Sequence, residues 1–298
     1  MHMKKLVLWG AVQFFASFLF ASSVAAADGC LVSDCHADLA LPKVVHSPVS
    51  EGECESCHQA TGAKHPGSAK GFKAVARGGE LCLQCHDDVG NEPNRHGPVR
   101  AGRCNFCHTP HASDNPALLL GSGNKICFYC HGGIERIVKN ARSQHAPVAE
   151  GRCWDCHKPH GSEFKPLLKD YYPAEFYTPY RYENFALCFR CHDDRAFLYE
   201  RTSEATSFRN GDYNLHVLHV NKAKKGRVCK SCHGVHGGDQ DKLILSKIPG
   251  FGSWEIPINF QRTANGGTCF VGCHKPKTYD RLSQQQILRE QKTIFGQE

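Results

Sequence analysis

The chain has 298 residues, of which 18 are cysteine, 19 are histidine and two are methionine. Its length allows one or two ordinary domains, but so many cysteines and histidines indicate a chain organised around repeated sites. Beyond residue 27 no stretch approaches the twenty apolar residues that a membrane helix needs, which excludes an integral span in the mature chain.

The first 27 residues have the three parts of a secretory signal peptide. Lys4 and Lys5 supply the positive end, residues 6–24 are apolar, and residues 25–27 offer a small-residue cleavage site. Because the apolar run is long, an uncleaved anchor is the alternative. We expect an exported, soluble mature chain that begins near Asp28.

The cysteines fall into nine pairs, and a histidine directly follows each pair. Seven pairs have the spacing C-x-x-C-H: Cys54/Cys57, Cys82/Cys85, Cys104/Cys107, Cys127/Cys130, Cys153/Cys156, Cys188/Cys191 and Cys229/Cys232. Two pairs are stretched, Cys30/Cys35 by four residues between them and Cys269/Cys273 by three. The histidines that follow, here called proximal, are His36, His58, His86, His108, His131, His157, His192, His233 and His274.

This spacing suits the covalent attachment of haem. Cysteines at i and i+3 lie on one face of a helical turn, so both sulfurs can bond to one porphyrin edge, and the next histidine can bind the iron. Zinc ribbons, thioredoxin-like pairs and disulfides also use cysteine pairs, but they have no need of that histidine. We expect nine covalent haems c on short helical turns; a terminal disulfide is the alternative for Cys30/Cys35.

Three segments share one pattern, which indicates internal repeats. They are HSPVSEGECESCHQA from His46, HGPVRAGRCNFCHTPH from His96 and HAPVAEGRCWDCHKPH from His145, and a looser copy starts at His219. Each continues to a second cysteine pair through a bridge that is leucine-rich in the later copies and more diverged in the first, so the repeat holds two sites. We expect an extra site over 28–43 and two-haem repeats over 44–92, 93–140, 141–210 and 211–298, the last with a helical tail.

Nine histidines of the mature chain are not proximal, and we call them spare. They are His46, His65, His96, His111, His145, His160, His216, His219 and His236. Nine haems and nine spare histidines predict two histidine ligands for each iron, although surface histidines without a ligand role are the alternative for some. Met1 and Met3 lie in the leader, so methionine ligation is excluded and haem potentials should be low. The sequence leaves open whether His216 or His219 serves the extra haem.

Chain length limits which spare histidine can bind which haem. Two imidazoles on opposite faces of one iron place their Cα atoms about 12–13 Å apart, whereas three fully extended residues span about 10–11 Å. His160 should therefore bind a neighbouring haem and not the one held by His157. The same holds for His111 and His236, and the remaining pairings stay open.

Two further stretches are distinctive. Residues 171–189 are dense in aromatic rings, which we interpret as a loop packed against porphyrin faces; a partner surface is the alternative. A basic cluster surrounds the eighth site and could dock an acidic partner or neutralise haem propionates: Lys222, Lys224, Lys225, Arg227 and Lys230. Because each oxidised haem adds about −1, the mature holoprotein carries about −4, and the basic sequence is no indication of nucleic-acid binding.

The motif C-x-x-C-H-x-P-H, as in CNFCHTPH and CWDCHKPH, is followed by a leucine-rich bridge and by LCFRCH. Over residues 44–275 this pattern resembles the doubled-CXXCH multihaem c-type cytochromes. The resemblance implies electron transfer in the periplasm or at the outer surface, in anaerobic or extracellular metal respiration. The partners that it implies are other redox proteins: cytochromes, a quinol-oxidising complex or a porin conduit.

About thirty residues per haem are too few to bury each porphyrin in its own core. We expect a multihaem cytochrome c fold of mostly irregular coil, with short α-helices packed around a chain of covalent haems, elongated, and with little or no β-sheet. Longer helices are expected over 133–144, 193–206 and 280–292.

We expect an electron carrier with no catalytic residues. The alternative is a multihaem reductase of a small oxyanion or nitrogen compound, which needs one iron with an open position. The matched count of haems and spare histidines argues against it, and the C-x-x-C-K motif of pentahaem nitrite reductases does not occur in the sequence.

Overall fold

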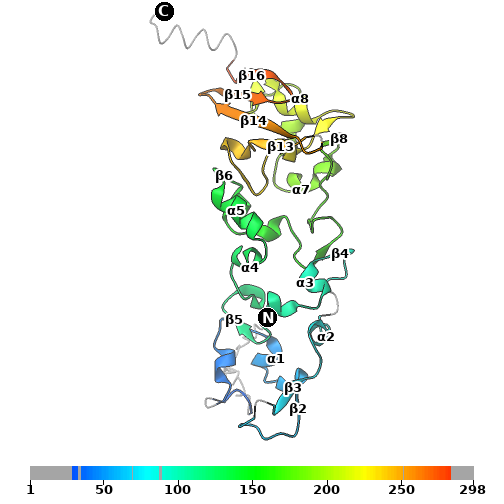
Figure 1. The fold of residues 1–298 in the computed structure, drawn as a ribbon, viewed down its shortest axis with the longest axis vertical. Helices are drawn as coiled ribbons and strands as arrows, with labels where there is room; N and C mark the ends of the chain where they lie inside the picture. Colours follow the sequence, from blue (N-terminus) through cyan, green and yellow to red (C-terminus); the bar gives the residue numbers. More distant parts are fainter. Residues whose placement is uncertain (1–28, 33–34, 69, 87–88, 251, 283–298) are drawn as a thin grey trace, which may run out of the picture.

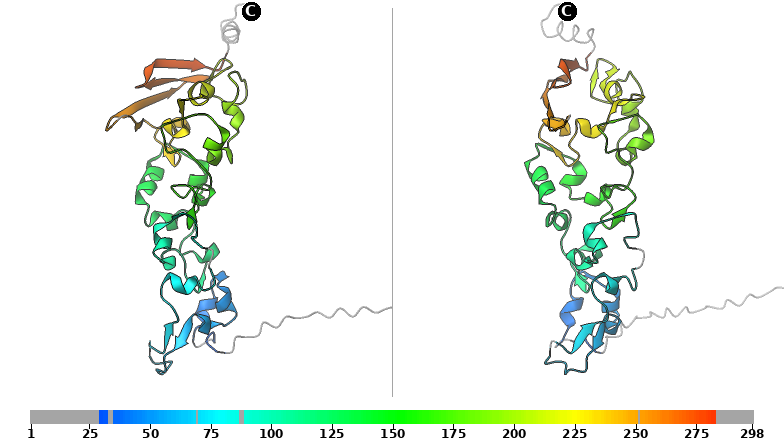
Figure 2. Two further views of the ribbon diagram at one scale, coloured as in Figure 1. Left: turned by 90° about the vertical axis from the view of Figure 1, so that its right-hand side faces the viewer. Right: turned by 45° about the vertical axis from the view of Figure 1, so that its right-hand side comes forward.

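The computed structural model describes residues 29–32, 35–68, 70–86, 89–250 and 252–282. Over these residues the molecule is elongated, and the chain passes along the long axis in sequence order (Figures 1 and 2). The expected signal peptide and most of the expected helix over 280–292 lie outside the described residues. Within the described ranges, no helix is long and apolar enough to cross a membrane.

The helices are short. The α-helices are α1 (Ser47–Ser50), α2 (Gly79–Cys82), α3 (Gly97–Arg100), α4 (Lys125–Phe128), α5 (Gly132–Asn140), α6 (Ala146–Ala149), α7 (Ala186–Phe189) and α8 (Leu215–Val220). The 3-10 helices are η1 (Ala37–Ala40), η2 (Cys54–Ser56), η3 (Cys104–Phe106), η4 (Pro116–Leu118), η5 (Cys153–Asp155), η6 (Tyr182–Phe185), η7 (Asp194–Phe197), η8 (Cys229–Ser231) and η9 (Asp241–Leu243). Helix α5 overlaps the helix expected over 133–144, whereas η7 and turns occupy 193–206.

The expectation of little or no β-sheet is wrong, because strands make up 23% of the structure and helices 28%. The strands are β1 (Val44–Val45), β2 (His58–Ala60), β3 (Phe72–Ala74), β4 (Asn94–Arg95), β5 (Ala112–Ser113), β6 (Ser143–Gln144), β7 (Gly161–Ser162), β8 (Tyr177–Thr178), β9 (Arg209–Asn210), β10 (Tyr213–Asn214), β11 (Gly226–Arg227), β12 (Gly237–Gly238), β13 (Lys247–Pro249), β14 (Glu255–Arg262), β15 (Gly266–Val271) and β16 (His274–Asp280). In the described part of the chain they form seven antiparallel sheets, six of two strands and one of four.

Each of the first three repeats opens with the same short helix. Helices α1, α3 and α6 begin directly after a histidine and carry proline in their first turn, where its missing N–H is not needed. A glycine with positive φ follows each helix, namely Gly52 (75°), Gly102 (64°) and Gly151 (74°). Glycine ends a helix there because it adopts this conformation without a Cβ clash.

Three two-stranded sheets join neighbouring repeats: β1 with β5, β4 with β7, and β6 with β12. The first strand of each sheet directly precedes a repeat-opening histidine, and the second directly follows the spare histidine of the next repeat. The N–H of His46 donates to the carbonyl of His111 over 2.8 Å, and that of His96 to His160 over 3.0 Å. The sheets therefore fix spare histidines in pairs across the repeat boundaries.

The C-terminal end is a four-stranded sheet in the order β13-β14-β15-β16, seen at the top of Figure 1. Strand β14 alternates exposed and buried residues, and Ile256 and Ile258 pack with Ile248 in a small core. A second core centres on Phe185, which is fully buried against Tyr172 and Val228. Nine hydrophobic side chains of the described residues form the buried core. Most other hydrophobic side chains of these residues are partly or fully exposed.

Candidate haem sites

The regular cysteine pairs lie on single helical turns. At the first site of each repeat, the first cysteine begins a 3-10 helix: η2, η3, η5 or η8. At the second site of the first three repeats, the first cysteine lies in an α-helix: α2, α4 or α7. The N–H of His108 donates to the carbonyl of Cys104, and that of His157 to Cys153, each over 3.0 Å. These bonds close the turn, so two thiols and one imidazole leave the backbone together, as attachment to one porphyrin edge requires.

The two stretched pairs differ from each other. The N–H of His36 donates to the carbonyl of Cys30 over 3.1 Å, so the wider N-terminal spacer still closes into a turn. At the other end Cys269 lies on β15 and His274 opens β16, with a register shift between Cys269 and Val271. The last site is therefore built on a bulged β-hairpin, where the sequence led us to expect a helical turn.

Seven proximal histidines face a spare histidine. The pairs, proximal first, are His36/His65, His58/His111, His86/His46, His108/His160, His131/His96, His157/His236 and His192/His145, with ring centroids 5.9–6.2 Å apart and ring planes within 37° of parallel. Two nitrogens bound to one metal at about 2 Å each, with about 1 Å more from each nitrogen to its ring centre, give about 6 Å. The pairs are thus spaced as two axial ligands of one iron.

The pairing follows one rule along the chain. A repeat-opening histidine faces the second proximal histidine of its own repeat, as His46 faces His86. The spare histidine that follows a first site faces the first proximal histidine of the preceding repeat, as His160 faces His108. His65 faces His36 of the extra site. Histidine rings of neighbouring repeats therefore face each other.

The last repeat ends this series. The charge of His233 lowers the pKa of His216, and the charge of His274 lowers that of His219, in both cases after the larger effect of burial. His219 opens the repeat and lies near its second proximal histidine, as the rule requires. In the earlier repeats, the histidine that faces the first proximal histidine comes from the following repeat. In the fourth repeat, His216 of the same repeat lies near the first proximal histidine, His233. Neither serves the extra site.

Hydrogen bonds orient the rings. The Nδ1 of His108 donates to the carbonyl of Ala117 over 2.8 Å, and His157 and His233 make the same bond to residues nine positions later, Pro166 and Lys242. A proton on Nδ1 leaves Nε2 free to bind a metal, and such bonds fix the ring orientation. Among the spare histidines, the Nδ1 of His46 donates to the carbonyl of Pro110 and that of His219 to the carbonyl of Leu215, and the Nδ1 of His216 is hydrogen-bonded to the hydroxyl of Thr206.

The leucine-rich bridges supply these carbonyls. In the bridges of the second, third and fourth repeats, residues other than glycine adopt positive φ, among them Ala117 (54°), Leu167 (62°) and Lys242 (60°). Such conformations are unfavourable and are usually retained at functional sites. Here they turn the bridge back onto the cysteine motif, and Leu120 donates its N–H to the carbonyl of Cys107 over 2.9 Å. The bridges thus hold the proximal rings in place.

Burial lowers the pKa of six spare histidines, which favours the neutral form of the ring. It lowers the pKa of His216 to about 4, and it also lowers the pKa of His111, His145, His160, His219 and His236. Removal from water disfavours the charged imidazolium. These rings therefore stay neutral at physiological pH, and the neutral imidazole is the form that binds metal.

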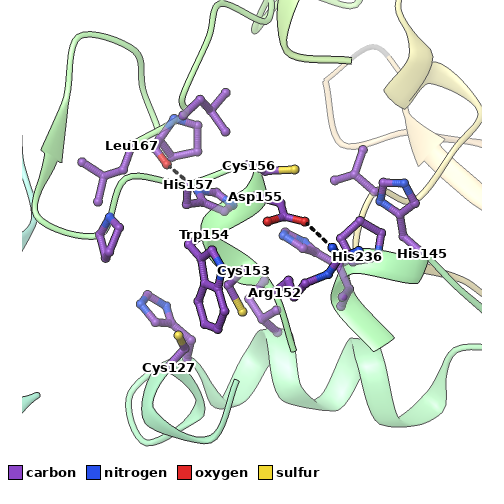
Figure 3. A pocket seen from close by; sticks show the side chains of 18 of the residues that line it. Cys127, His145, Arg152, Cys153, Trp154, Asp155, Cys156, His157, Leu167 and His236 are labelled. Atoms are coloured by element: carbon purple, nitrogen blue, oxygen red, sulfur yellow. Dashed lines mark hydrogen bonds and ion pairs between the residues drawn. The ribbon is translucent and has the colours of Figure 1, made fainter. Parts of the chain in front are cut away.

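A cavity of about 3200 Å³ connects the sites. It is lined by the 18 histidines from His36 to His274 and by every cysteine except Cys35, together with many apolar side chains. Figure 3 shows its middle part, where the thiols of Cys127 and Cys153 approach each other and His157 is bonded to the bridge. At the seven regular sites and at the last site, both cysteines and the proximal histidine line the cavity, and this donor set fits a covalently held porphyrin.

At the extra N-terminal site, the cavity is lined by Cys30 and by the proximal His36, but not by Cys35. The side chains of Cys30 and Cys35 are both exposed. The N–H of Cys35 donates to the carbonyl of Val32 over 3.0 Å.

Consecutive sites are neighbours in space. The first cysteines of adjoining sites contact each other: Cys30 with Cys54, Cys82 with Cys104, Cys127 with Cys153, and Cys188 with Cys229. The alternate junctions bring together Cys57 with Cys82, Cys107 with Cys130, Cys156 with Cys191, and Cys232 with Cys269. The sites thus form one row in sequence order.

Two buried serines support the sites and were missed in the sequence. Ser113 donates to the carbonyl of Leu119 over 2.6 Å, and Ser162, which is 1% exposed, donates to Leu168. Each lies two residues after a spare histidine, in the segments PHAS and PHGS. That shared position was the signal, and these bonds fasten the bridge to the strand behind the histidine.

The comparisons with known proteins agree with this geometry. The family model of the doubled CXXCH motif matches residues 46–91, 96–136 and 145–197. Curated proteins gave no match. The three matches cover the segments in which cysteine pairs alternate with facing histidines. Over these residues the chain matches the doubled CXXCH motif three times, which is consistent with a multihaem c-type cytochrome.

Proposed function

We propose that the chain holds nine covalent haems c, each between two histidines, and carries electrons along them in one row. The bound haem supplies the reversible one-electron change of its iron. The cysteines hold the porphyrin edge, the proximal and spare histidines fill both axial positions, and the bridges keep the rings oriented. With two histidines and no methionine at each iron, the potentials lie on the low side.

One observation carries this proposal. In seven pairs, a histidine that follows two cysteines faces a spare histidine at 5.9–6.2 Å. Chance contacts between imidazoles would vary in partner and distance, whereas these pairs follow one rule through the repeats. The row of contacting cysteine pairs along the long axis supports transport from one end of the molecule to the other.

Reduction of a small oxyanion or nitrogen compound is the second candidate. It requires a five-coordinate iron, and hence a proximal histidine with no histidine opposite. Seven proximal histidines have a facing ring, and His233 and His274 lie close to His216 and His219. This pairing favours the carrier.

We infer export to the periplasm, or to the outer membrane or cell surface, from the N-terminal sequence. There the protein would exchange electrons with other cytochromes, a quinol-oxidising complex or a porin conduit, in anaerobic or extracellular metal respiration. The family resemblance supports this setting. Fractionation of cells, followed by haem staining, tests the location.

The intact mass of the denatured holoprotein tests the haem count, because thioether bonds survive denaturation. We expect the mature chain plus nine haems. A C30A/C35A variant should carry eight haems, and a C54A/C57A variant, the matched control at a regular site, should also carry eight. A wild-type mass with fewer than nine haems contradicts the proposal, and a C30A/C35A mass with no haem lost assigns those cysteines to a disulfide.

Single variants separate the two thiols of the extra site. Because Cys30 lines the cavity and Cys35 does not, we expect Cys30 to make the main attachment there. C35A should therefore keep nine haems, whereas C30A should carry eight. Loss of a haem in C35A would show that Cys35 is needed for attachment in spite of its exposed position.

A further inference from the structure

Charge is distributed unevenly along the chain. Residues 29–200 contain 19 Lys and Arg against 20 Asp and Glu, whereas residues 201–282 contain 13 against six. The chain passes along the long axis in order, so this excess of seven positive charges lies at the C-terminal end of the molecule (Figure 1). The remainder is close to neutral before haem is counted.

Five exposed lysines contribute much of this excess positive charge. Lys222, Lys224 and Lys225 are exposed in the loop between α8 and β11, and Lys275 and Lys277 are exposed on β16. We call these five residues the basic end face. Within the described part of the chain, the ion pairs at this end join other side chains and leave these lysines to solvent.

The basic end face adjoins the ninth haem site. Strand β16 begins at the proximal His274, and Lys277 on this strand is paired in register with Cys269 of the same site. On the other side, Lys222 and His274 both lie close enough to His219 to affect its charge. Lysines from both segments therefore lie close to the residues of the ninth site.

Haem propionates account for part of the positive charge but not for all of it. Arg227, Arg262 and Arg281 line the cavity, and their charge would offset that of propionates bound there. Because each oxidised haem adds about −1, the eighth and ninth haems leave about +5 at this end, while seven haems leave about −8 on the rest of the molecule. The holoprotein is therefore strongly dipolar along its row of sites.

We propose that the basic end face docks an acidic electron-transfer protein, and that electrons enter or leave the row there, through the ninth site. The inference rests on the proposed function. Opposite charge steers such a partner and orients it on contact, and the ninth site lies beside the face that it would meet. The same positive charge would attract an anionic membrane, but contact with a membrane does not require a haem at the contact point.

Two triple variants of the holoprotein test the proposal. K222E/K224E/K225E reverses three exposed lysines of the end face, and K64E/K70E/K73E reverses three exposed lysines at the opposite end, with the same change in net charge. The probe is a gold electrode coated with a carboxylate-terminated monolayer, which presents an acidic surface. We expect electron exchange with this surface to slow on the order of tenfold in the end-face variant at low salt, and to change less than twofold in the control.

Equal losses in the two variants would show an effect of net charge alone and would overturn the proposal, and so would no loss in either. Sedimentation with vesicles of anionic phospholipid is the second arm. Binding of the wild-type holoprotein that is lost in the end-face variant would assign the face to a membrane and overturn the proposal. Haem content is measured in every variant, and fewer than nine haems in wild type contradicts the proposed function separately from docking.

Discussion

Replacing His236 by alanine tests the exchange of ligands between repeats. His236 belongs to the fourth repeat, but its ring faces His157 of the third repeat at 6.2 Å. Since the other eight pairs do not involve this histidine, H236A should convert one iron in nine from six-coordinate low-spin to high-spin, and no more. Magnetic circular dichroism normalised to haem content measures the fraction. Added imidazole should restore the low-spin state.

A second variant shows which iron has lost its ligand. In H236A/C153A/C156A the haem beside His157 is not attached, so eight haems remain and all should be low-spin. If His236 served the haem beside His233 in its own repeat, one high-spin iron in eight would persist, and that result would refute the exchange. Val235→Ala is the control, because this neighbouring side chain is exposed and its loss should leave nine low-spin haems.

Three smaller predictions concern stability. S162A removes a buried hydroxyl that donates to Leu168 and accepts from the N–H of Phe164, so urea unfolding should show a loss of about 1–3 kcal/mol, and an unchanged midpoint would contradict this role. Lys242 is exposed at φ 60°, so K242G should be more stable than K242V by about 1–2 kcal/mol; equal stabilities would count against backbone strain in the bridge. The Tyr180 hydroxyl is buried without a hydrogen-bond partner among the described residues, and burial raises its pKa to about 12. Because the folded state holds this proton more tightly than the unfolded state, stability should fall as the pH rises from 10 to 12; Y180F should show a smaller fall than the wild type and be no less stable at pH 7, and a destabilised Y180F would disprove the reasoning.

The two cysteines and the proximal histidine of each regular site could be predicted from the sequence, because they lie within five consecutive residues. The pairing could not, because a ligand such as His236 comes from 79 residues beyond its partner His157. Chain span excluded some partners of His160 without choosing one. Which histidine faces His108 depends on two-residue strands such as β4 and β7, which pair across repeats. Strands this short show no alternating pattern in the sequence, so they could not be predicted from it.

The stretched N-terminal pair shows where spacing alone is insufficient. The sequence assigned Cys30 and Cys35 the same role, but only Cys30 lines the cavity. A count of intervening residues does not fix the direction of the second thiol, so it could not predict this difference.

The C-terminal sheet, by contrast, left a signal that was overlooked. Residues 255–260, EIPINF, alternate polar and apolar side chains, and Asn265 and two glycines follow as a turn. This strand pattern explains why the pair Cys269/Cys273 lies on a hairpin. The positive φ of Leu167 had no such signal, since leucine is a poor residue for that conformation and is held there by the bridge.

The account depends most directly on the coordination of every iron in the row. Electron paramagnetic resonance of the purified, oxidised wild-type protein, with spins normalised to haem content, measures it. Nine haems per chain, all low-spin, are the predicted result. A stoichiometric high-spin signal would mean an iron without its second histidine, and it would contradict the pairing and favour a reductase.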